Sequence, residues 1–465
     1  MGRLSLNASR RAFLQRASQL SMAGAAAPWA LNFAALAEAA AAGASDYKAL
    51  VCVFLYGGND CANTLVPFDP VHHEQYRRLR PNLAYSRIAL GGTVLETTTP
   101  SQNRHGVPVQ YALAPDLAPL MPFWQAGQLA TLLNVGTLVQ PTTKEQFRAR
   151  SVPLPPKLFS HNDQQSVWQA CAAEGAVSGW GGRMGDLFES GNGRATFTCV
   201  NVSGNAVFMS GRSVAQYQVT SNGPVALNAL RAPLYGSAAA SAALRALVTS
   251  AREHPMEAEH NRLTARALQA RDTLDAALAA TPPLATAFAA GNPLAEQLRM
   301  VARMIACAGA LGARRQVFLV SLGGFDNHDG LLTTHPVLLG RVATALAAFQ
   351  EALAELRVAD SVTTFTASDF GRTLTGNNDG SDHGWGSMHF VLGGAVQGQR
   401  HYGIAPVIAH DGPDDVGQGR LLPTTSVDQY AATLGSWFGL GASQLLEVLP
   451  SLRNFDPSAR QLAFV

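Results

Sequence analysis

Residues 49–60, Ala-Leu-Val-Cys-Val-Phe-Leu-Tyr-Gly-Gly-Asn-Asp, pass from an unbroken apolar run into two glycines and two polar residues. A short apolar run that stops at glycine is typical of a buried strand in a parallel sheet. We therefore expect a strand over 49–55. The turn after it should leave Asn59 and Asp60 at the carboxyl end of that strand.

Similar runs recur along the chain, separated by segments with helical spacing. We expect four more strands in the same sheet, over 129–135, 316–322, 361–366 and 388–392. We expect crossover helices over 293–312 and 337–356, and a last helix over 426–438 before an irregular tail. This alternation predicts an α/β fold, a mostly parallel sheet flanked by helices.

The middle of the chain has a different pattern. Residues 194–233 hold short strand-like runs with Gly-Asn turns, and an Ala-rich helical stretch follows over 238–278. We interpret 190–285 as a cap or insertion on a single α/β domain that covers residues 43–465.

The N-terminus contains Arg10-Arg11 followed by Phe13-Leu14 and a small, apolar, Ala-rich segment. This pattern predicts a twin-arginine signal over residues 1–42. The alternative is an ordinary basic region before a general secretory signal. On the first interpretation the protein is periplasmic or secreted, and the twin-arginine translocation machinery exports it already folded. We expect no later stretch to be long and apolar enough to span a membrane.

Composition bears on two questions, whether the protein binds nucleic acid and whether its cysteines form disulfides. Charged residues are 14% of the chain and the formal net charge is +2, without a long basic run, so a nucleic-acid partner is not expected. The five cysteines form no CxxC pair, and their odd number leaves at least one unpaired in a monomer. We expect Cys52 and Cys307 to be buried free thiols.

Polar motifs follow the predicted strands, at the sheet edge where ligands bind in open α/β folds. Asp326 and His328 alternate by two, so in an extended segment both side chains face the same side. His383 could reach them if its loop folds back over the strand ends. Asp and His ligands suit a divalent metal ion, with Zn, Mn, Ca or Mg as candidates. The alternative is no metal, with these residues forming hydrogen bonds within their loops.

Three further residues each have two interpretations. Ser160 is a candidate nucleophile at a helix N-terminus, or else a plain N-cap. Arg372 could hold a phosphate, sulfate or carboxylate through two hydrogen bonds, or else pair with Asp369 or another carboxylate. Asp60 is a metal ligand or a turn former after the two glycines.

Several motifs carry a resemblance to a known family. FLYGGNDCANTLVP, FSHNDQQSVWQ, LGGFDNH, ASDFGRT and DHGWGSMHFVLGGAVQG occur in order after the twin-arginine leader. The chain resembles the family called domain of unknown function 1501, which is regarded as related to the alkaline phosphatase and sulfatase superfamily. The resemblance implies an alkaline phosphatase-like α/β fold with a metal site at the strand ends.

The resemblance also implies roles for individual residues. Asp326 and His383 fall where the superfamily keeps ligands of one metal, and Asp369 falls where it keeps a ligand of another. The superfamily has a His after that Asp, whereas this chain has Phe370. The leading hypothesis is therefore an exported, metal-dependent hydrolase-like protein acting on a phosphate or sulfate ester. Its ligand candidates are Asp60, Asp326, His328, Asp369 and His383, with Ser160 and Arg372 as catalytic candidates.

The competing hypothesis is a non-catalytic exported protein on a degenerate form of the same fold. The resemblance implies a second exported protein as a partner, because members of the family often accompany one.

Overall fold

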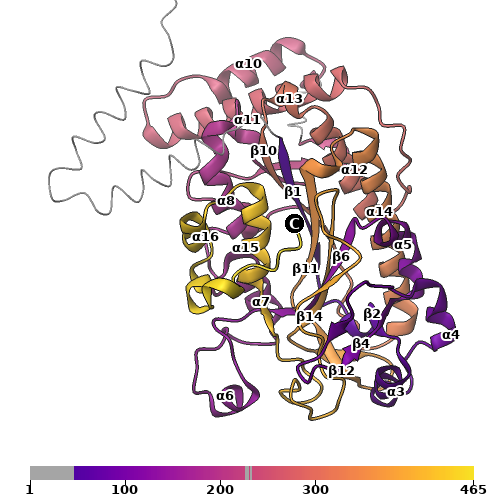
Figure 1. Ribbon diagram of the computed structural model, residues 1–465. Helices are drawn as coiled ribbons and strands as arrows, with labels where there is room; N and C mark the ends of the chain where they lie inside the picture. Colours follow the sequence, from indigo (N-terminus) through magenta and orange to yellow (C-terminus); the bar gives the residue numbers. More distant parts are fainter. Residues whose placement is uncertain (1–46, 226–229, 231–232) are drawn as a thin grey trace, which may run out of the picture.

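The computed structural model describes residues 47–225, 230 and 233–465 (Figure 1). The expected export signal over residues 1–42 lies outside the described residues. The strands of the main sheet are β1 (Lys48–Leu55), β6 (Leu129–Gly136), β7 (Cys199–Asn201), β8 (Tyr217–Thr220), β9 (Gly223–Pro224), β10 (Arg315–Leu322), β11 (Val362–Ser368), β14 (Ser387–Leu392), β15 (His401–Tyr402) and β16 (Thr425–Ser426). Their order is β15-β6-β14-β11-β1-β10-β7-β8-β9, and β16 also pairs with β6.

The remaining strands form small antiparallel pairs. These are β2 (Leu65–Pro67) with β5 (Tyr111–Leu113), β3 (Ser101–Gln102) with β4 (Pro108–Val109), and β12 (Arg372–Gly376) with β13 (Ser381–His383). The α-helices are α3 (Pro70–Leu79), α4 (Arg87–Leu90), α5 (Met121–Gln125), α6 (Lys144–Ala149), α7 (His161–Ala170), α8 (Trp180–Phe188), α10 (Ala238–Thr249), α11 (Pro255–Ala280), α12 (Pro293–Ala306), α13 (Ala308–Leu311), α14 (Leu331–Glu355), α15 (Val427–Phe438) and α16 (Ala442–Val448).

The expected fold class is confirmed. All five expected strands form, as β1, β6, β10, β11 and β14. Strand β1 runs parallel to both of its neighbours, β10 and β11. Strand β14 runs antiparallel to β11 and β6. Because β14 is reversed, its start lies at the sheet edge where β1, β10 and β11 end, and this brings the segment before β14 to that edge.

Both faces of the sheet are covered, and β1 shows why its sequence is apolar throughout. Val51, Val53 and Leu55 pack into one core, while Cys52 and Phe54 pack into the other. Successive side chains of a strand point to opposite faces, so a strand buried on both sides needs an apolar residue at every position. Figure 1 shows α12 and α14 over one face and α8 and α15 over the other.

Helix α14 is the one helix, among the described residues, that is long and apolar enough to cross a membrane. The sequence analysis expected no such stretch after the leader, and that expectation is wrong by length and composition. In the fold, α14 packs on α12 and buries a continuous apolar stripe that includes Leu338, Val342, Leu346 and Phe349. The apolar composition of α14 is therefore explained by its burial in the core between the helices and the sheet.

The middle of the chain contributes directly to the main sheet. Within 190–285, β7 pairs in parallel with β10, and β8 pairs with β7. Residues 207–209, within the segment expected to hold short strand-like runs, form a 3-10 helix instead. Helices α10 and α11 follow and contact each other. The bounds of the expected insertion stay a prediction.

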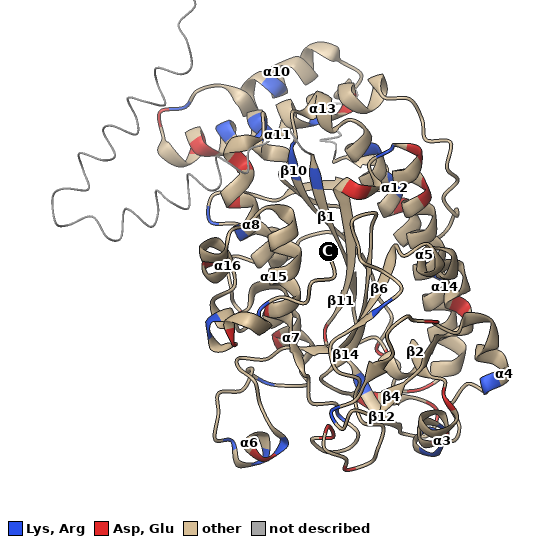
Figure 2. Cartoon of the chain, in the orientation of Figure 1, with Lys and Arg blue, Asp and Glu red and all other residues tan. Residues whose placement is uncertain are grey.

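Two local details complete the comparison with expectation. The tail after α15 holds a further helix, α16, where irregular chain was expected. The cysteines are all free, and Cys52 and Cys307 are buried as expected. Figure 2 shows that the central parts of the strands contain almost no charged residues, whereas charged residues lie near the strand ends and on the helices.

Candidate metal centre

The candidate site lies where several chain segments meet at one edge of the sheet. Asp326 and His328 follow β10, Asp369 follows β11, and His383 ends β13 just before the reversed strand β14. His161 is the first residue of α7. The loops expected after β11 and before β14 are in part the β12–β13 hairpin, in which Arg372 pairs with His383.

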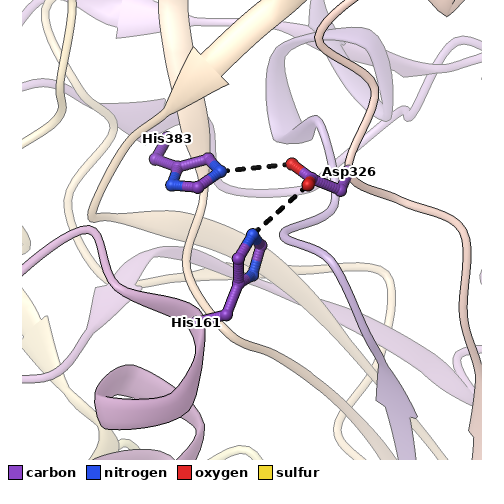
Figure 3. Close-up of side chains that lie close together, drawn as sticks. All are labelled: His161, Asp326 and His383. Atoms are coloured by element: carbon purple, nitrogen blue, oxygen red, sulfur yellow. Dashed lines mark hydrogen bonds and ion pairs between the residues drawn. The ribbon is translucent and has the colours of Figure 1, made fainter.

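Three of these side chains form a compact group. His161, Asp326 and His383 each offer one atom to a set in which all atoms lie within 4.8 Å of one another, and Figure 3 shows both imidazoles directed at the carboxylate. The Nε2 atom of His383 lies 3.2 Å from Oδ1 of Asp326. The Nε2 atom of His161 lies 3.4 Å from Oδ2 of the same residue.

His328 contacts the same carboxylate oxygen as His383. Its Nε2 atom lies 3.1 Å from Oδ1 of Asp326 and 3.0 Å from Nε2 of His383. With the 3.2 Å contact between His383 and Asp326, these atoms form a nearly equilateral triangle. An edge of 3.1 Å divided by √3 puts each corner about 1.8 Å from the triangle's centre. Because Zn²⁺ binds nitrogen at about 2.0–2.1 Å, a point slightly above the plane lies at bonding distance from all three atoms.

Each imidazole has its other ring nitrogen bound to an oxygen acceptor. Nδ1 of His161 lies 2.6 Å from Oδ2 of Asp369, and Nδ1 of His328 lies 3.1 Å from Oδ1 of Asp382. Nδ1 of His383 lies 2.7 Å from the Phe159 carbonyl oxygen. A carbonyl or carboxylate oxygen requires a donor, so Nδ1 carries the proton in each ring. In the neutral rings the Nε2 lone pairs are therefore left facing Asp326.

The pKa values of these groups reflect both burial and neighbouring charge. Burial raises the pKa of Asp326, but the hydrogen bond and charge of Arg372, together with His161 and His328, lower it below its ordinary range overall. The hydrogen bond to Asp369 raises the pKa of His161, against the effect of burial. Burial lowers the pKa of His383, which favours its neutral, metal-binding form.

Glycines allow these segments to approach closely. Gly57 has φ +114°, and a Cβ there would lie 2.5 Å from the backbone nitrogen of Asp326. Gly58 has φ +79°, and a Cβ there would lie 2.5 Å from the ring of Phe370. The pair of glycines after β1 is thus needed both for its backbone conformation and for the room it leaves beside the site.

The structure brings Asp326, His328 and His383 together, and it places Asp369 one step behind them. Asp369 is 1% exposed and accepts hydrogen bonds from Gln165 and from the backbone of Gly57 as well as from His161. In this position Asp369 orients a candidate ligand. Such carboxylate–histidine pairs set the orientation and basicity of metal ligands in proteins.

Arg372 pairs with a carboxylate of the cluster. Its Nη1 atom lies 2.6 Å from Oδ1 of Asp326, and its guanidinium also donates to the carbonyl oxygens of Gly57 and Ser381. Of the two interpretations of Arg372, this is the pairing with a neighbouring carboxylate. The partner is Asp326, however, and Asp369 pairs with His161.

Asp60 and Ser160 are engaged away from Asp326. Asp60 is fully buried in an ion pair with Arg80 at 2.8 Å, and it accepts a hydrogen bond from Ser381. Ser160 precedes α7 without forming a side-chain cap, and its hydroxyl donates to Asp163 at 3.0 Å. Neither side chain is a member of the His161–Asp326–His383 group.

Sequence reasoning did not select His161 as a site residue, although it quoted the motif around it. The available signal was the position of His161 in the first turn of a helix, from which an imidazole can reach the carboxyl ends of the strands. Phe370 occupies the position after Asp369 and is 2% exposed. Its ring centroid lies 4.9 Å from that of His161 and 4.7 Å from that of His383. It therefore packs against both imidazoles, which also contact each other.

The fold and the cluster define an α/β protein with a candidate metal centre of histidine and carboxylate at the strand ends. The chain belongs to the family described as "Protein of unknown function (DUF1501)", which matches residues 47–449. This membership confirms the family resemblance. No curated protein matches the sequence.

Several solved structures have a distant similarity to the chain. Ps i-CgsB in complex with k-i-k-neocarrahexaose has 10% identity and a TM-score of 0.36, over 89% of this chain and 78% of that one. The PsFucS1 sulfatase from Pseudoalteromonas sp. has 10% identity and a TM-score of 0.33, over 93% and 75%. An alkaline phosphatase PafA mutant has 11% identity and a TM-score of 0.27, over 70% and 64%. Similarity at this level assigns no residue or activity to this chain.

Proposed function

We propose that this protein binds one divalent metal ion through Asp326, His383, His328 and His161, and that it hydrolyses a phosphate or sulfate ester there. The observation that carries the proposal is the shared orientation of the imidazoles. Each holds its Nδ1 proton on an oxygen acceptor and turns Nε2 toward Asp326. Neutral rings in this arrangement direct lone pairs at a carboxylate, which is repulsive unless a cation lies between them or the rings take up a second proton.

The donor set fits some metals better than others. Imidazole nitrogen with one carboxylate suits Zn²⁺ and Mn²⁺, whereas Ca²⁺ and Mg²⁺ prefer sites made entirely of oxygen. When bound, an ion of this kind polarises a substrate oxygen or lowers the pKa of a water. The protein's own residues orient the ligands through Asp369, Asp382 and the Phe159 carbonyl.

The site's surroundings favour a single ion. Phe370 packs against both His161 and His383, which also contact each other at 4.4 Å between ring centroids, and its ring offers no ligand atom. The Oδ1 atom of Asp326 that faces His328 and His383 already accepts a hydrogen bond from the buried guanidinium of Arg372 at 2.6 Å. A second ion at this carboxylate would add further positive charge there and would have few ligands.

The choice of ester rests on the resemblance to the alkaline phosphatase and sulfatase superfamily. The proposal also includes export through the twin-arginine pathway, on the strength of Arg10 and Arg11, which lie outside the described residues. A protein whose ligands come from positions as far apart as 161 and 383 assembles its site only by folding. Export after folding is consistent with such a site.

Metal analysis tests the proposal directly. Protein purified without chelator is expected to carry close to one equivalent of metal and to hydrolyse at least one member of a panel of phosphate and sulfate esters. His383→Ala should lose both properties. His105→Ala, at an exposed histidine, should keep them. Absence of stoichiometric metal, with ester hydrolysis unchanged in His383→Ala, contradicts the proposal.

A second candidate function is a non-catalytic metal-binding protein that serves another exported protein. Two observations favour it. Phe370, which offers no ligand atom, packs against the imidazoles of His161 and His383, and the Ser160 hydroxyl is hydrogen-bonded to Asp163. On this alternative the protein binds metal but hydrolyses no ester, and a pull-down from periplasm recovers a stable partner. His383→Ala would then change metal content and leave the ester panel at background.

A further inference from the structure

Arg420 lies next to the candidate metal centre and is held by two contacts. Its Nε atom donates to the backbone carbonyl of His383 at 3.0 Å. Its guanidinium lies over the ring of Phe159, 4.5 Å from the ring centroid. Phe159 and His383 are themselves joined, because the Phe159 carbonyl holds Nδ1 of His383. Arg420 therefore contacts both His383 and Phe159, the residue whose carbonyl holds the His383 imidazole in place.

The loop that carries Arg420 is strongly constrained. Gly417, Gln418 and Gly419 have φ of +125°, +60° and +76°, an unusual run that includes one residue other than glycine. Asp415 accepts hydrogen bonds from the amides of Gly417 and Gly419 at 2.7 and 2.9 Å. The same loop is fastened to β12, because Leu374 donates its amide proton to the carbonyl of Gly419 at 2.7 Å.

This anchoring leaves the outer N–H groups of the guanidinium without a hydrogen bond. Within the described residues, Nε is the one atom of the Arg420 side chain that forms a hydrogen bond, and the neighbouring carboxylates of Asp382 and Asp415 act on its charge without forming an ion pair within 4.0 Å. The side chain is half-buried. A fixed guanidinium with unused N–H groups beside an active centre is suited to receive an oxyanion through two parallel hydrogen bonds.

We infer that Arg420 is a specificity-determining residue that binds a second anionic group of the substrate, a carboxylate, sulfate or phosphate, apart from the ester group held at the metal centre. The inference rests on the proposed function for the identity of that ester. It implies that the preferred substrates carry more than one negative charge.

A purely structural role for Arg420 makes a different prediction. If the residue only fixes the His383 carbonyl, its loss disturbs the metal centre and weakens all ligands alike. If it binds a second anion, its loss affects only ligands that carry one. The discriminating quantity is therefore the ratio of affinities for two probes that differ by one anionic group.

The experiment measures binding by calorimetry, with chelator-treated and Zn²⁺-loaded protein side by side. The probes are phenylphosphonate and its 3- and 4-carboxylated analogues, with the corresponding sulfonates as a second series, because these compounds have no ester bond to hydrolyse during the titration. We expect at least one carboxylated probe to bind about ten-fold more tightly than its parent, as one charge-assisted contact provides. Arg420→Gln should abolish this ratio and Arg420→Lys should retain part of it. Arg212→Gln, at an exposed arginine paired with Glu447, should leave it unchanged.

Several outcomes overturn the inference. It fails if Arg420→Gln weakens parent and carboxylated probes equally, if the ratio survives in that variant, or if no carboxylated probe binds better than its parent in either form of the protein. Failure of the proposed function is separate. In that case no ester is hydrolysed, yet the Arg420-dependent ratio persists in direct binding.

Discussion

Replacing Asp369 by Asn should weaken divalent metal binding by about ten- to hundred-fold while leaving the fold intact. In the native protein Asp369 accepts the Nδ1 proton of His161 at 2.6 Å and so directs Nε2 of that ring toward Asp326. An asparagine can turn either its oxygen or its amino group toward Nδ1, and it lacks the charge that makes the imidazole a stronger ligand.

The size of the effect follows from this indirect position. Loss of a carboxylate behind a ligand histidine changes metal affinity by about ten- to hundred-fold, or about 1.4–2.8 kcal/mol. Asp369 is almost completely buried, and it also accepts hydrogen bonds from Gln165 and the Gly57 amide. Asparagine keeps the size of the side chain and one acceptor oxygen, so we expect only a small loss of folding stability.

The assay is titration of Zn²⁺ into metal-free protein, with circular dichroism to verify the fold. Asp382→Asn provides a parallel test, because Asp382 accepts the Nδ1 proton of His328. Asp456→Asn, at an exposed carboxylate near the C-terminus, is the control and should bind as the wild type does. Wild-type affinity in a folded Asp369→Asn variant would refute the reasoning about ligand orientation.

Three further predictions concern stability, each measured by urea unfolding. Burial raises the pKa of Asp428 from 3.8 to about 7. Between these pH values the native state holds a proton that the unfolded state releases. The free energy of unfolding should therefore fall as the pH rises from about 4 to 7, by roughly 4 kcal/mol at most. Asp428→Asn should remove this decline, and a wild-type profile that is flat over that range would be incompatible with it. Gly57→Ala should destabilise the protein more than Gly204→Ala, because both glycines have φ above +100° but only Gly57 has backbone within 4 Å of an added Cβ; equal losses would rule out the steric argument. Arg80→Leu should cost about 3–5 kcal/mol by leaving the charge of Asp60 buried and unpaired, and adding Asp60→Asn should restore part of the loss, whereas additive losses would show that the ion pair is not the cause.

The strands were predictable because a short run that is apolar at every position is typical of a strand buried on both faces. β1 is apolar at every position, since alternate residues enter different cores on the two faces of the sheet. The helices α12 and α15 were predictable from their spacing for a similar reason. Short elements such as β12 and β13 were not, because their pairing depends on contacts with distant loops rather than on a repeating pattern.

The candidate site was only partly predictable. Asp326 and His328 could be paired from their spacing in one segment, and His383 could join them if its loop folded back over the strand ends. Their joint position depends on the reversal of β14, which carries His383 to the edge where β10 ends. The local sequence pattern of a strand does not indicate whether it runs parallel or antiparallel to its neighbours.

The sequence alone thus determined the α/β class, the positions of the main strands and most of the polar residues that gather at their ends, though not His161. These follow from hydrophobic periodicity and turn residues, which are local properties. The tertiary structure decided which polar residues meet. It joined His161 to Asp326, put Asp369 behind that histidine, and buried Asp60 against Arg80. Such choices depend on distances between segments far apart in the chain, and only the packed sheet fixes those distances.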